Sequence, residues 1–185
     1  MIDAAFGTPL PAPPLRAAGS SRVEHAWAVL ATVLDPEVPV VSVVDLGIVR
    51  AVSDDGDALT VVVTPTYSGC PATEVIEASI VAALDDAGLG PTRIRMQRAP
   101  AWTTDWISED GKRKLLAYGI VPPGPASNAE VPIRFFPRAA KTVALACPRC
   151  GSHHTERLAA FGSTACKATW RCLDCKEPFE HFKPI

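Results

Sequence analysis

The chain has 185 residues, a formal charge of −2 and 48% hydrophobic residues. This length allows one ordinary domain, or a domain of about 100 residues with a small module attached, and the apolar content excludes a wholly disordered chain. No apolar run approaches the roughly 18 residues that span a bilayer, and the N-terminus lacks the basic and apolar segments of a signal peptide. We therefore expect a cytoplasmic protein with no membrane partner, and the acidic balance argues against nucleic acid as a partner.

The N-terminal region divides into a leader and a first helix. Residues 1–20 contain four prolines together with Gly, Ala and Ser, a composition typical of a disordered leader. Residues 21–34 then repeat apolar side chains at spacings of three and four, which predicts a helix with one apolar face. Asp35-Pro36 ends it, because a residue before proline avoids helical angles.

Further elements follow in the order expected of a small sheet with helices packed on it. Alternating β-formers around a turn at Ser53–Asp57 predict a hairpin, and Gly88 ends a helical pattern that begins at Pro71. A half-buried strand and a short helix complete the pattern at residues 92–98 and 108–118. The order α-β-β-α-β-α indicates the α+β class.

The C-terminal region differs from the body in composition and charge. Residues 21–125 carry a net charge of −6 and residues 147–185 carry +2. Five prolines fall between Pro122 and Pro137. We therefore place a linker or extension at 126–146, between an α+β body at 21–125 and a small module at 147–185.

Two Cys-x-x-Cys pairs dominate this module. Cys147 and Cys150 form the first pair, Cys172 and Cys175 the second, and 21 residues separate them. Two such knuckles can bring four thiolates to one ion, and so short a tail needs a metal in place of a core. Zinc is the default ion for such a ribbon, while a single iron or an iron–sulphur cluster remains an alternative.

Other potential ligands in the module are less clear. Cys166 is left over, and it could replace one ligand or remain a thiol beside the site. His153 and His154 lie in the loop between the knuckles, where solvated histidines are the expected interpretation because no cysteine ligand is missing.

The body holds one cysteine, Cys70, directly before Pro71. At the N-terminus of the second predicted helix, unpaired N–H groups and the helix dipole would favour a thiolate. A buried apolar cysteine is the alternative. We favour a reactive or ligating thiol.

Two acidic constellations accompany this thiol. Asp35-Pro36-Glu37-Val38-Pro39 presents two carboxylates on a loop stiffened by two prolines, and a solvated turn is the alternative interpretation. In Asp45-Leu46-Gly47, an Asp that bonds nearby backbone N–H groups beside a conformationally tolerant Gly indicates a structural turn at least as strongly as chemistry.

These segments together resemble a known family. "DPEVPVVSVVDLGIVR" and "TPTYSGCPA" are similar to the MIP18-like domain, formerly a domain of unknown function, whose members act in iron–sulphur cluster assembly. "APAWTTDWISEDGKRKL", "CPRCGSHHTE" and "FGSTACKATWRCLDCKEPFEHFKPI" resemble one branch, the D (or J) components of phenylacetyl-CoA epoxidase systems. This resemblance covers nearly the whole chain apart from the leader.

The resemblance implies an accessory role in aerobic phenylacetate degradation. The chain would support maturation of iron or iron–sulphur centres in a complex whose other subunits, among them an iron–sulphur reductase, are its partners. Cys70 matches the family's reactive cysteine, which would bind iron or a cluster transiently, and Asp35 and Glu37 match its acidic loop. Cys147, Cys150, Cys172 and Cys175 match its metal-binding tail. Dimerisation through the body stays open.

Two other classes of function compete with this one. A thiol-dependent enzyme would use Cys70 as nucleophile, but Cys70 has no Cys-x-x-Cys partner, and His25 is the only histidine of the body. A nucleic-acid-binding ribbon would need more positive charge than +2. Trp102, Trp106 and Trp170 would suit a protein interface if exposed, with core packing as the alternative.

Overall fold

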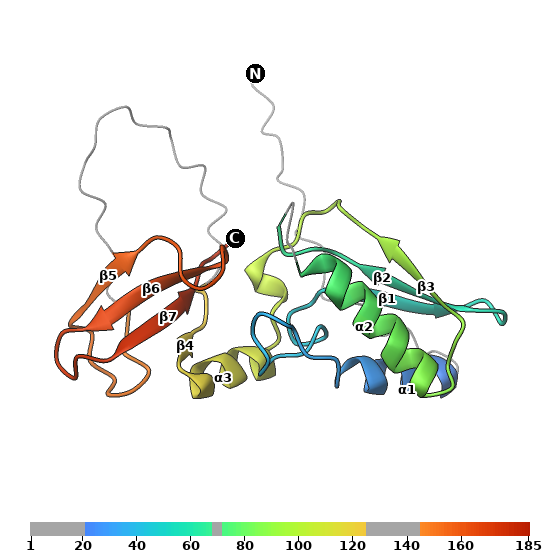
Figure 1. The fold of residues 1–185 in the computed structure, drawn as a ribbon, viewed down its shortest axis with the longest axis horizontal. Helices are drawn as coiled ribbons and strands as arrows, with labels where there is room; N and C mark the ends of the chain where they lie inside the picture. The colour runs from blue at the N-terminus through green and yellow to red at the C-terminus, as the bar shows by residue number, and fades with distance from the viewer. Residues whose placement is uncertain (1–20, 68–71, 125–144) are drawn as a thin grey trace, which may run out of the picture.

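The computed structural model describes residues 21–67, 72–124 and 145–185. The predicted leader, Cys70 and most of the predicted linker lie outside these residues. The α+β class is confirmed: a three-stranded sheet with two helices is joined through a third helix to a four-stranded C-terminal sheet (Figure 1). Within the described residues, no helix is both long and apolar enough to cross a membrane.

The body's sheet combines antiparallel and parallel pairings. β1 (Val49–Asp54) and β2 (Leu59–Val63) form the predicted hairpin, and β3 (Thr92–Met96) pairs with β2 in parallel. A parallel partner needs a crossover connection, which α2 (Thr73–Asp86) supplies. β2 therefore lies in the centre of the sheet, where its side chains are almost all buried.

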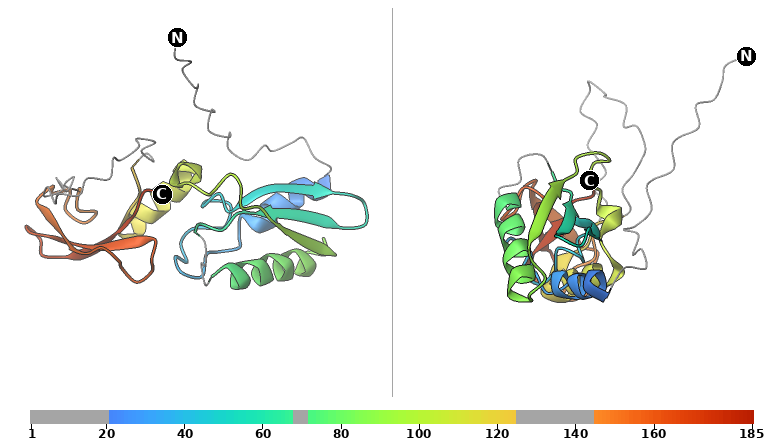
Figure 2. Two further views of the ribbon diagram at one scale, coloured as in Figure 1. Left: turned by 90° about the horizontal axis from the view of Figure 1, so that it is seen from above. Right: turned by 90° about the vertical axis from the view of Figure 1, so that its right-hand side faces the viewer.

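Both helices of the body cover the sheet and contact one another. α1 (Ser21–Leu30) packs on β1, and α2 packs on β3 (Figure 2). α1 is four residues shorter than the predicted helix, because Leu34 pairs with Ser42 in an isolated bridge and Asp35 N–H donates to the Val41 carbonyl. These pairings turn residues 31–47 into a folded loop, which carries Asp35 and Glu37.

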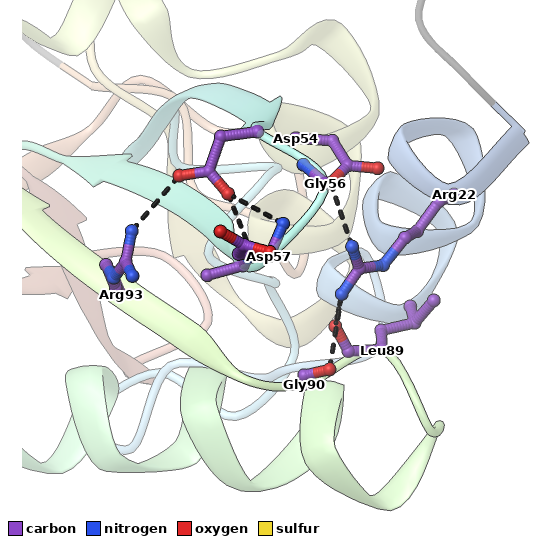
Figure 3. A network of polar contacts seen from close by, with 9 residues as sticks. Arg22, Asp54, Gly56, Asp57, Leu89, Gly90 and Arg93 are labelled. Atoms are coloured by element: carbon purple, nitrogen blue, oxygen red, sulfur yellow. Dashed lines mark hydrogen bonds and ion pairs between the residues drawn. The ribbon is translucent and has the colours of Figure 1, made fainter.

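The end of the body away from the ribbon is held by Arg22 of α1. Its guanidinium donates to Asp54 at 2.8 Å and to the carbonyls of Leu89 and Gly90 at 2.8 and 3.2 Å (Figure 3). One side chain thus joins α1 to the β1–β2 turn and to the α2–β3 connection. Because these groups are partly buried, the contact is more than a surface ion pair.

A second set of polar contacts fixes the loop to α3 (Glu109–Tyr118). The Asp45 carboxylate accepts from Ser42 N–H at 2.9 Å and from Lys114 of α3 at 2.7 Å. Gly47 has a φ of +67°, and a Cβ there would lie 2.6 Å from the Trp106 carbonyl oxygen. Asp45 and Gly47 therefore shape and fix this loop. This is the structural role that the sequence indicated at least as strongly as a chemical one.

The C-terminal sheet has the order β4-β7-β6-β5. β5 (Thr155–Ala159), β6 (Lys167–Cys172) and β7 (Pro178–Phe182) form antiparallel neighbours, and β4 (Ile120–Val121) adds to β7 in parallel. The sequence did not predict β4. The domain boundaries proposed at residues 125 and 147 stay predictions. β4 precedes both boundaries in the chain, yet it pairs with β7 of the C-terminal sheet.

Body and ribbon share a hydrophobic core. Cys166 and Phe182 of the ribbon belong to the same buried cluster as the body's sheet and helices, and Phe182 lies 6.2 Å from the Trp102 ring. The Ile185 carbonyl accepts from Thr104 N–H at 3.2 Å and from Thr103 Oγ1 at 2.9 Å, so the chain end is fixed beside the short helix Thr104–Trp106. The ribbon is therefore packed on the body along this seam.

Candidate metal centre and acidic cavity

The four cysteines of the two Cys-x-x-Cys pairs lie together at one end of the ribbon. All four sulfur atoms lie within 4.8 Å of one another, with Cys147 and Cys175 3.7 Å apart and Cys150 and Cys172 3.6 Å apart. Four Zn–S bonds of about 2.3 Å in a tetrahedron place sulfur atoms about 3.8 Å apart. The arrangement therefore fits a tetrahedral ion.

The backbone around these cysteines is shaped for thiolates. N–H groups of Cys175 and Asp174 lower the pKa of Cys172 to about 6. Gly151 takes a φ of +75° directly after the first pair, and its N–H donates to the Cys147 carbonyl at 2.8 Å. These turns bring the pairs together from a loop and from the end of β6, and they leave Cys147 and Cys172 buried.

Neighbouring polar side chains join the two knuckles rather than adding ligands. The His154 Nδ1 lies 3.1 Å from Asp174, which also accepts from the Ser152 hydroxyl. The set of clustered ligands within the described residues consists of the four cysteines alone. Cys166 lies elsewhere, directly before β6 and against the body.

Asp35 and Glu37 lie on the folded loop beside a narrow cavity between body and ribbon. The Asp35 side chain is buried, and its Oδ1 accepts from the N–H groups of Glu37 at 2.9 Å and Val38 at 2.7 Å. Burial raises the pKa of Asp35, against the opposing effect of these N–H groups and of Lys167. Burial and the neighbouring Asp35 raise the pKa of Glu37 as well.

This acidic cavity gathers side chains from both parts of the chain. Its volume is about 20 Å³, room for about one water-sized occupant. Its polar lining side chains come from the loop, the end of β2, α2 and the ribbon, and comprise Asp35, Glu37, Thr64, Thr66, Thr73, Glu77 and Cys166. The sequence pointed to the two loop carboxylates, whereas no local pattern could place Thr64, Glu77 and Cys166 beside them.

A wider groove adjoins the acidic cavity. Tyr67, Arg98, Trp102 and Ile185 line it, and it shares with the cavity Thr64, Pro65, Thr66, Thr73, Glu77 and Met96. Residues 68–71, which include Cys70, connect Tyr67 to α2. The described residues on both sides of Cys70 therefore border the groove, although Cys70 itself lies outside the described part of the chain.

The tryptophans are buried and so belong to the packing of this chain. Trp102 donates from Nε1 to the Leu46 carbonyl at 2.9 Å, and the Arg50 guanidinium lies 3.5 Å from the centre of the Trp106 ring. Trp170 is 5% exposed within the ribbon. Of the two interpretations that the sequence left open, core packing holds for all three.

Comparison with known proteins matches two separate segments of the chain to family models. Residues 24–94 match the iron–sulfur cluster assembly protein model, and residues 135–183 match the PaaD zinc beta ribbon domain. A curated relative from Escherichia coli K12, the putative D component of 1,2-phenylacetyl-CoA epoxidase, is 44% identical over 165 residues, which cover 89% of this chain and 94% of the relative. The chain belongs to the family of phenylacetyl-CoA epoxidase D components.

Two further matches cover about half of this chain. An Fe-S protein maturation auxiliary factor of Porphyromonas gingivalis is 34% identical over 94 residues, or 50% of this chain and 89% of the relative. A domain of unknown function, DUF59, from Bacillus anthracis is 26% identical with a TM-score of 0.48, and covers 51% of this chain and 92% of its own. The two family models and the relative from Escherichia coli confirm, for both parts of the chain, the resemblance inferred from the sequence motifs.

Proposed function

We propose that this chain is a cytoplasmic accessory subunit of a phenylacetyl-CoA epoxidase system, and that it supports assembly of the iron or iron–sulphur centres of its partner subunits, with the iron–sulphur reductase as one candidate. In this proposal Cys70 binds iron or a cluster transiently, and the ribbon cysteines hold a structural zinc ion. Family membership supports the assignment to the epoxidase system, and the assembly domain supports the maturation role.

The observation that carries the proposal is the position of the acidic loop. Asp35 and Glu37 line a cavity that shares six side chains with the groove bordered by both flanks of Cys70. A thiolate and carboxylates at one site provide soft and hard ligands, a combination that suits iron better than Mg²⁺ or Ca²⁺. Iron is cargo here, and Asp35 or Glu37 could also take the proton that a thiol releases when it binds metal.

Replacement of Cys70 tests the proposal. We expect Cys70→Ser to lower epoxidase activity and partner iron content at least tenfold when it replaces the wild-type chain during co-expression with the other subunits, because a hydroxyl does not replace a thiolate as an iron ligand. Leu158→Ala, at an exposed position of β5, is the control and should leave both quantities unchanged. Full partner iron and full activity with a folded Cys70→Ser chain would contradict the proposal.

The alternative of a thiol-dependent enzyme has less support. Burial lowers the pKa of His181, which lies in the ribbon. The ring of His181 packs edge-on against Trp170, 6.3 Å away between centroids. Neither the acidic cavity nor the groove has a histidine among its described lining residues, so a Cys–His pair has no support there.

A further inference from the structure

Three arginines gather on β3 and directly after it, at one edge of the body's sheet. Arg93, Arg95 and Arg98 fall within six residues with no acidic side chain between them, whereas residues 21–125 as a whole carry a net charge of −6. Arg93 pairs with Asp55 of the β1–β2 turn at 3.0 Å. Arg95 and Arg98 are exposed, and neither has an ion pair or a hydrogen bond within the described residues.

The other arginines and lysines of the body are already engaged with partners of their own. Residues 21–125 contain 8 basic and 14 acidic side chains. Besides Arg93, ion pairs hold Arg22, Lys112, Arg113 and Lys114, and the Arg50 guanidinium stacks on the Trp106 ring. In the described part of the body, the two basic side chains left without a partner therefore both belong to the edge at β3, although carboxylates are in excess. Exposed guanidinium groups in such a position favour an anionic partner from outside the chain.

The backbone of β3 offers a second means of recognition. Among the described strands, β3 pairs with β2 alone and so forms an edge of the sheet (Figure 1). On the β2 side, Gln97 N–H donates to the Val63 carbonyl at 2.8 Å. Because alternate residues of a strand bond to the same neighbour, the N–H and C=O groups of Ile94 and Met96 face outward from the sheet. Such an edge can accept an added strand.

The arginine side chains lie where a strand added at this edge would meet them. Ile94 and Met96 pack against the core under the helices. Since successive side chains of a strand point to opposite faces, Arg93 and Arg95 lie on the face of the sheet away from the helices. Alternate side chains of an added strand would stand beside them on that face.

We propose that the edge of β3 binds an extended acidic segment of a partner protein, which adds to the sheet as a fourth strand and pairs its carboxylates with Arg95 and Arg98. The backbone edge supplies hydrogen bonds to the added strand, and the arginines select its charge. Arg98 also lines the groove bordered by the flanks of Cys70, so the segment binds next to that groove. Naming the partner as an epoxidase subunit that receives iron rests on the proposed function, whereas the docking surface does not.

Two other occupants fit this edge less well. A second copy of the chain that paired antiparallel about Ile94 or Arg95 would set arginine opposite arginine, and like charges in that position are destabilising. DNA would satisfy the arginines, but its phosphate backbone has no donors for the outward carbonyls of β3. An acidic peptide segment uses both the charge and the backbone of the edge.

The test titrates the full chain with the remaining subunits of the epoxidase system, purified without this chain. We expect Arg95→Glu to raise the dissociation constant at least about fivefold, because it replaces an attraction by a repulsion. Arg157→Glu is the matched control, since it reverses an exposed arginine on β5, the edge strand of the ribbon, and should leave binding unchanged. Hydrogen exchange at single residues reads the added strand directly. Exchange of the Ile94 and Met96 amides should slow at least about tenfold on binding, while that of Gln97, already bonded to β2, changes less.

Three results would overturn this docking surface: no binding of the remaining subunits, equal binding by Arg95→Glu and Arg157→Glu chains, or binding without protection of the Ile94 and Met96 amides. Self-association through the same amides, or binding of single-stranded DNA alone, would also overturn it. Any of these results leaves the proposed function standing if Cys70→Ser still abolishes maturation. Weaker binding by Arg95→Glu together with normal maturation by the Cys70→Ser chain would instead remove the proposed function and keep the docking surface.

Discussion

Replacing Cys172 with serine should cost the ribbon its metal and unfold it. The ribbon's separate buried cluster contains only five of the described residues, two of which are Cys147 and Cys172, so little apolar burial remains without an ion. Structural zinc in small domains supplies roughly 10–16 kcal/mol of apparent binding free energy. We expect loss of the bound zinc and a lower melting temperature of the whole chain.

The same substitution should also affect the body. Phe182 packs against Trp102, and the Ile185 carbonyl is held by Thr103 and Thr104, so an unfolded ribbon exposes part of the shared core. Metal analysis, calorimetry and tryptophan fluorescence measure these effects, with Leu158→Ala as the control that should keep zinc and stability. A Cys172→Ser chain with full zinc and an unchanged transition would show that the four cysteines are not the metal centre.

Asp35→Asn should separate stability from function. The Asn carbonyl can still accept from the N–H groups of Glu37 and Val38, while the buried charge disappears. Because burial raises the pKa of Asp35, the native state binds its proton more tightly than the unfolded state does. Wild-type stability should therefore fall as the pH rises from about 3.8, the ordinary value, through the raised pKa of the native state.

We expect Asp35→Asn to flatten this pH dependence and to be at least as stable as the wild type at pH 7. The variant should nevertheless lose maturation activity, because an uncharged amide is a poor iron ligand. Asp35→Ala removes the acceptor as well and should be destabilised by about 1–2 kcal/mol. Urea unfolding across pH measures both effects, and an Asp35→Asn chain that is less stable than Asp35→Ala at pH 7 would refute this account of the loop.

Much of the fold could be predicted because local signals agreed with tertiary packing. Ser108 accepts from Gly111 N–H, and Gly119 has a φ of +97°, as expected for residues that begin and end a helix. The first helix was predicted too long, since its apolar spacing continues to Leu34 although that residue belongs to the folded loop and is 50% exposed. β4 has only two residues and exists through pairing with β7, which lies far along the chain, so no local pattern shows it.

The candidate sites also differ in how far the sequence alone could predict them. Spacing alone grouped the four ribbon cysteines, because two Cys-x-x-Cys pairs leave few alternatives. Cys166 could not be placed from its neighbours in sequence, since its position depends on how the ribbon docks on the body. Thr64 and Glu77 reach the cavity from β2 and α2 for the same reason. The sequence alone therefore does not predict which residues meet where the ribbon packs on the body.

The most direct test of the maturation role asks whether the chain is still needed once the partner centres are complete. The epoxidase complex is matured with the wild-type chain present, this chain is then removed, and the iron content and epoxidase turnover of the remaining subunits are measured. The maturation account predicts that both persist, while subunits produced with Cys70→Ser lack iron and activity. Turnover that stops on removal of the chain and returns when it is added back without iron would contradict it, and would make the chain a working part of the catalytic complex.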